Sequence, residues 1–115
     1  MNSSRYVLFT ILVLLSPVRA LWAHPPAAIK LEYDQKQKSL HIEVAHVSHD
    51  PRDHHIRKIS VTRNDGKPVI RYFPTQTKPS SLIVEVPLEA KKNDTIKVLA
   101  VCNEGGQKEE TLVVP

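Results

Sequence analysis

The stretch LHIEVAHV, residues 40–47, alternates apolar and polar side chains and decides the fold. Successive side chains of a β-strand point to opposite faces, so Leu40, Ile42 and Val44 share one face with His46. Loops follow directly after this stretch, and the ends of strands are where sites are built on a rigid scaffold. The pattern predicts a half-buried strand whose inner face ends at a histidine.

Six other stretches have a similar β-branched character and are set off by turn residues such as NDG at 64–66, a hairpin signal. Helix signals are scarce. Seven evenly spaced strands without helices predict an all-β fold, a seven-stranded antiparallel immunoglobulin-like β-sandwich. The other expected strands are AIKLEYD (28–34), IRKISVTR (56–63), PVIRYF (68–73), SLIVEVP (81–87), TIKVLAVC (95–102) and ETLVV (110–114).

The N-terminus has the layout of a secretory signal peptide, with a positive start, an apolar run at 7–15 and small residues at two cleavage positions. The apolar run is shorter than the roughly 20 residues that span a bilayer. We expect a signal peptide at 1–23 and one domain at 24–115, exported to the periplasm or the extracellular space. Cleavage after Ala20 and cleavage after Ala23 both fit.

The charge of the chain indicates no polyanionic partner. The formal net charge is +4, and removing residues 1–23 takes away two arginines and no acid, which leaves +2. These charges are interspersed, which argues against binding to nucleic acid or, in the mature form, to a membrane. The sequence gives no indication of the oligomeric state.

Cys102 is the only cysteine, which is unusual in an exported protein. It cannot form an internal disulfide, so it is a buried thiol, an intermolecular bridge or a metal thiolate. The alternation of TIKVLAVC places Cys102 on the face of Val98 and Ala100, at the end of a strand and pointing inward.

Four of the six histidines lie within residues 46–55. Imidazole and thiolate are ligands that suit iron, copper and zinc. Read alone, this segment is also compatible with a solvated polar loop. The candidate metal ligands are His24, His46, His49, His54, His55 and Cys102.

Three ordered pieces resemble the iron domain of superoxide reductase and desulfoferrodoxin: HPP from His24, IEVAHVSHDPRDHHI from 42 to 56, and VCNEGG from 101. The resemblance spans residues 24 to about 106. It implies a seven-stranded immunoglobulin-like fold and a ferrous iron with four equatorial imidazoles, one axial thiolate and one open position. It also implies reduction of superoxide, or another small oxidant, with electrons from an external donor.

The family pattern carries over residue by residue. His24 matches the first histidine, His54 the histidine before the third expected strand, and Cys102 the axial cysteine. The second histidine is His46 or His49, and strand parity favours His46. Arg52 stands where the family has a charged pair and is the residue expected to steer an incoming anion.

Gly105 departs from the pattern, because the family has a histidine three residues after its cysteine. At most three of the four equatorial histidines are therefore matched, and His49, His55 and water are the candidates for the remaining position. A working superoxide reductase and a divergent, degenerate metal-binding relative both stay open.

Two other functions compete with the iron site. If cleavage follows Ala23, the free amine and the imidazole of His24 could chelate copper, with His46 or His54 as third ligand. The second is a metal-free immunoglobulin-like binding module, because this architecture hosts many functions and the fold alone does not decide between them.

Overall fold

The computed structural model describes residues 25–115, and this part of the chain contains strands and turns but no helix. Nothing within these residues therefore forms a helix able to cross a bilayer. The predicted signal peptide at 1–23, its cleavage positions and His24 lie outside the described residues. The strands are β1 (Ala28–Asp34), β2 (Ser39–Ala45), β3 (Ile56–Arg63), β4 (Val69–Tyr72), β5 (Ser81–Pro87), β6 (Thr95–Cys102) and β7 (Gln107–Val113).

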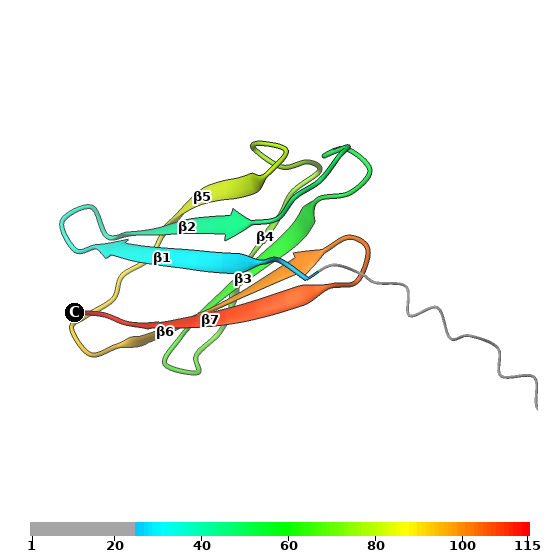
Figure 1. The fold of residues 1–115 in the computed structure, drawn as a ribbon. Coiled ribbons are helices and arrows are strands. Elements are labelled where there is room, and N and C mark those ends of the chain that lie inside the picture. The colour runs from blue at the N-terminus through cyan, green and yellow to red at the C-terminus, as the bar shows by residue number, and fades with distance from the viewer. Residues whose placement is uncertain (1–24) are drawn as a thin grey trace, which may run out of the picture.

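The strands form two sheets that face each other (Figure 1). One sheet has the order β1-β2-β5 and the other the order β4-β3-β6-β7, and neighbouring strands are antiparallel throughout. This arrangement confirms the predicted immunoglobulin-like sandwich.

The core follows from the alternation of the two central strands. In β2, every second residue is fully buried, and in β6 the same holds from Ile96 to Cys102. Burying a Val, Leu or Ile side chain contributes about 1.5–3 kcal/mol, so these two strands supply much of the stabilisation. The buried apolar residues are Ile29, Leu40, Ile42, Val44, Ile56, Ile59, Val61, Leu82, Val86, Ile96, Val98, Ala100, Cys102 and Val114.

Four strands coincide with their predicted ranges, whereas β2, β4 and β7 differ. Strand β7 begins at Gln107 rather than at 110, because Gln107 already pairs with Val101 across a tight turn. Its residues are mostly exposed, so hydrophobic alternation could not reveal its start. Strand β2 ends at Ala45, before His46, but the extended backbone continues: His46 N–H donates to the carbonyl of Ser80 at 3.0 Å.

The NDG signal is confirmed as a hairpin turn between β3 and β4. Asn64 and Asp65 both have positive φ, at 48° and 56°, and the N–H of Gly66 donates to the carbonyl of Arg63 at 2.9 Å. Two consecutive left-handed residues are typical of the type I′ turn, whose twist matches that of the flanking strands.

Candidate metal centre

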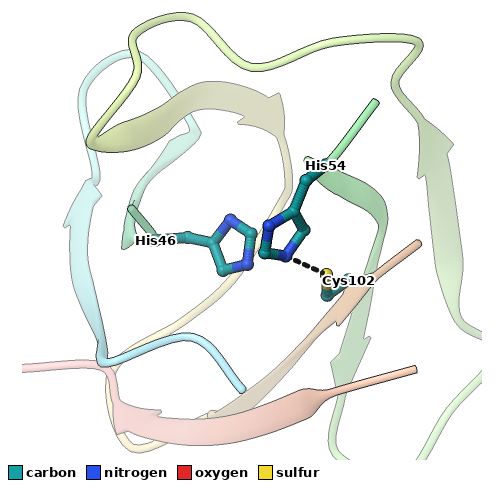
Figure 2. A group of neighbouring side chains, drawn as sticks. All are labelled: His46, His54 and Cys102. Carbon is teal, nitrogen blue, oxygen red and sulfur yellow. Dashed lines mark hydrogen bonds between the residues drawn. The ribbon is translucent and has the colours of Figure 1, made fainter. Parts of the chain in front are cut away.

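Three side chains from three elements meet at one end of the sandwich (Figure 2). His46 follows β2 in one sheet, while His54 precedes β3 and Cys102 ends β6 in the other. The antiparallel pairing of Ile56 with Cys102 brings the start of β3 beside the end of β6. The group therefore lies between the two sheets, at one end of the core.

The potential ligand atoms of the three residues all lie within 4.8 Å of one another. His54 Nε2 is 3.0 Å from Cys102 Sγ, and the rings of His46 and His54 meet edge to face with centroids 4.7 Å apart. Two imidazoles and a sulfur at these separations form a donor set that suits iron, copper or zinc.

Burial sets the protonation of the cysteine. Cys102 is 1% exposed. This burial raises the pKa of the thiol above its ordinary value, and the charge of the Glu104 carboxylate also raises it, whereas the backbone N–H groups of Glu104 and Gly106 act in the opposite direction. Because metals bind the thiolate, an incoming ion has to displace this proton.

Gln76 determines which nitrogen of His46 carries a proton. Its Nε2 donates to the carbonyls of His46 at 3.0 Å and Lys78 at 3.1 Å, which turns its Oε1 toward Ile56 N–H at 3.1 Å and toward His46 Nδ1. An amide oxygen can only accept, so His46 Nδ1 is the donor. The lone pair then lies on Nε2, so Nε2 is the nitrogen that can act as a metal ligand. Such outer hydrogen bonds are the usual support of metal-binding histidines.

The backbone around His54 is held on both sides. The N–H of His54 donates to the carbonyl of Asp50 at 2.8 Å, and the carbonyl of His54 accepts from Ser48 Oγ. Asn103, next to the cysteine, accepts from His55 N–H at 3.0 Å and donates to the carbonyl of Asp53 at 2.6 Å. Asn103 therefore fixes the position of His54 relative to Cys102.

A cavity of about 420 Å³ reaches His46 and His54 and is also lined by Pro25, Ala27, Val47 and His49. It is large enough for a small oxidant. A larger hollow of about 560 Å³ lies over the turn between β1 and β2, and its lining includes none of the three clustered residues.

The structure separates the two alternatives for the second histidine. His46 is 2% exposed and belongs to the group with His54 and Cys102, whereas His49 is exposed and only lines the cavity. His55 is buried but is not part of the group. Arg52 is exposed, lies 3.5 Å from Asp50 and does not line the cavity, so its steering role stays a prediction.

Sequence reasoning missed the supporting roles of Gln76, which lies outside the motifs, and of Ser48, which lies within the histidine-rich segment. Gln76 lies in the polar loop PTQTKPSS, where nothing in its neighbours distinguishes it from a solvated residue. Its burial, with 6% of its surface exposed, emerges only when this loop folds against the end of β2.

Comparison with known proteins agrees with this geometry. The family model for desulfoferrodoxin matches residues 21–111. The chain belongs to the desulfoferrodoxin family. No curated protein matches this desulfoferrodoxin chain in a sequence comparison.

Two solved superoxide reductases share the fold of this desulfoferrodoxin chain. A variant of superoxide reductase (neelaredoxin) from Ignicoccus hospitalis has a TM-score of 0.53 at 18% identity, covering 83% of this chain and 84% of that one. A superoxide reductase in the oxidized state has a TM-score of 0.54 at 18% identity, with 82% and 92% covered.

Proposed function

We propose that this chain is an exported iron protein that reduces superoxide by one electron to hydrogen peroxide. The observation that carries the proposal is the group formed by the buried His46 and Cys102 and the partly buried His54, in a member of the desulfoferrodoxin family. An iron ion held there would supply the electron, and an external donor would restore the ferrous state, because the chain has a single cysteine and no cysteine-rich second centre.

The residues of this chain have separate roles in the proposal. His46 and His54 offer imidazole nitrogens, and Cys102 offers a soft thiolate that increases the electron density at the metal. Gln76 keeps the proton of His46 on Nδ1, and Asn103 holds the loop that carries His54. The cavity lined by His46, Val47 and His49 gives a small anion access to this end of the sandwich.

The stoichiometry of the products tests the reaction. Protein loaded anaerobically with ferrous iron should consume superoxide with an external reductant, release one hydrogen peroxide per superoxide, and release no dioxygen. His54→Ala should abolish the reaction, whereas His41→Ala, on the outer face of β2, should leave it unchanged. Dioxygen release with half the peroxide yield would indicate a dismutase instead, and wild-type protein that loses its iron on desalting would overturn the proposal.

Export is part of the proposal and rests on the layout of residues 1–23. Sequencing the N-terminus of the mature protein would test it and would also establish whether His24 becomes the first residue. The copper alternative depends on that outcome and does not need Cys102. The partly buried contact between His54 Nε2 and Cys102 Sγ at 3.0 Å favours a site that includes the sulfur.

A further inference from the structure

The turn between β6 and β7 is built for glycine at the position where the family pattern has a histidine. Gly105 has a φ of 100°, and its N–H donates to the carbonyl of Cys102 at 3.0 Å, which closes the turn. Residues with a Cβ rarely adopt this conformation. A histidine at position 105 would therefore be strained in this turn, and a protein ligand in its place has to come from another residue.

The preceding residue in this turn, Glu104, carries a carboxylate toward His54, the partly buried member of the group. Its Oε2 lies 3.7 Å from His54 Nε2, the same nitrogen that contacts Cys102 Sγ. Its N–H donates to Cys102 Sγ at 3.4 Å, which ties its backbone to the sulfur. The side chain is 54% exposed, so it has room to change rotamer at the edge of the site.

We propose that the carboxylate of Glu104 is the protein ligand that takes the place of the missing imidazole. This inference rests on the proposed iron-binding function. The carboxylate reaches His54 and stands outside the group of His46, His54 and Cys102. A rotation of its exposed side chain is the change required for it to join them.

The chemistry of the donor set supports this assignment. Two histidines and one carboxylate are the ligands of many non-haem ferrous sites, and here a thiolate would join them. A thiolate and a carboxylate together carry two negative charges, which balance those of a divalent ion. Without Glu104, the described residues offer one charged ligand, in a site whose sulfur is buried.

The test compares wild type with Glu104→Gln, Glu104→His and the control Glu109→Gln, which changes an exposed glutamate of β7. Ferrous affinity is measured by chelator competition, and cobalt(II) serves as a spectroscopic probe of coordination. We expect Glu104→Gln to weaken ferrous binding by roughly 10-fold or more. The cobalt d–d bands should shift while the thiolate band persists. Glu104→His should restore binding, and Glu109→Gln should leave it unchanged.

The outcomes separate this inference from the proposed function. If wild type retains iron with a thiolate band and Glu104→Gln has the same affinity and cobalt spectrum, Glu104 is not a ligand although the iron site stands. If Glu104→Gln weakens binding without changing the d–d bands, and histidine does not rescue it, Glu104 only positions His54 and the inference is also overturned. Wild type that holds neither iron nor cobalt refutes the iron site itself.

Discussion

The two ends of the sandwich use polar residues in opposite ways. At the end with the β1–β2 and β3–β4 turns, polar side chains are exposed and cap turns, as when Asp34 Oδ1 accepts from the N–H groups of Lys36 and Gln37 at 2.9 and 3.0 Å. The other end holds the buried polar residues of the described chain: His46, Ser48, His55, Gln76 and Ser81.

The difference indicates where function constrains this fold. Burying a polar group costs free energy unless it is hydrogen-bonded, and turns can be made without doing so, as the first end demonstrates. At the second end, polar groups are buried, and hydrogen bonds made by Gln76 and Asn103 offset the cost of burying them. This network holds two imidazoles and a sulfur close together, and that group distinguishes this end of the sandwich from the other.

The largest expected effect comes from removing Gln76. Gln76→Ala leaves buried partners such as His46 Nδ1 and Ile56 N–H without their acceptor, which should lower the free energy of unfolding by roughly 2–4 kcal/mol. Gln37→Ala, at the opposite end, removes only an exposed side chain. It should change the free energy of unfolding by less than about 0.5 kcal/mol. Urea denaturation of the metal-free proteins measures both. Equal stabilities would show that the buried network does not hold this end together.

A pair of asparagines separates support of the fold from support of the site. Asn103→Ala removes two hydrogen bonds to the backbone beside His54 and one from the Cys102 thiol, whereas Asn64→Ala removes two in the turn after β3, at 2.8 and 2.9 Å. Each loss should lower the unfolding free energy by about 1–2 kcal/mol, and Asn64→Ala should lower it further because Asn64 has a positive φ that alanine adopts poorly. Only Asn103→Ala should also weaken ferrous binding, by roughly 10 to 100-fold. Chelator competition measures this affinity, and a similar loss in Asn64→Ala would contradict the assignment.

The smallest expected effect lies on the outer face of the three-stranded sheet. A hydrogen bond from His41 lowers the pKa of Glu85, and one from Ser39 Oγ at 3.0 Å adds to the decrease. A lowered carboxyl pKa stabilises the fold above the pKa of the unfolded chain, about 4.3, and this contribution disappears as the pH falls through the folded pKa. In Glu85→Gln, the free energy of unfolding should therefore fall less steeply as the pH decreases through this range. Iron binding should be unchanged. An unaltered pH profile from urea denaturation would show that the pair contributes nothing.

The sequence was most informative where side chains alternate. LHIEVAHV and TIKVLAVC predicted both central strands and turned His46 and Cys102 inward, because parity follows from strand geometry alone. The supporting residue Gln76 was not predictable, since its burial depends on a loop folding onto a distant strand. Nor was the positive φ of Gly105, which depends on how tightly β6 and β7 are joined.

The most direct test of the account is whether Cys102 binds the metal. Protein from the exported fraction would be loaded anaerobically with ferrous iron, desalted and oxidised, and its visible spectrum compared with that of Cys102→Ser. We expect a thiolate-to-ferric charge-transfer band in the wild type that is absent in the variant. Iron that is lost on desalting, or a spectrum that the substitution leaves unchanged, would contradict a metal site formed by His46, His54 and Cys102.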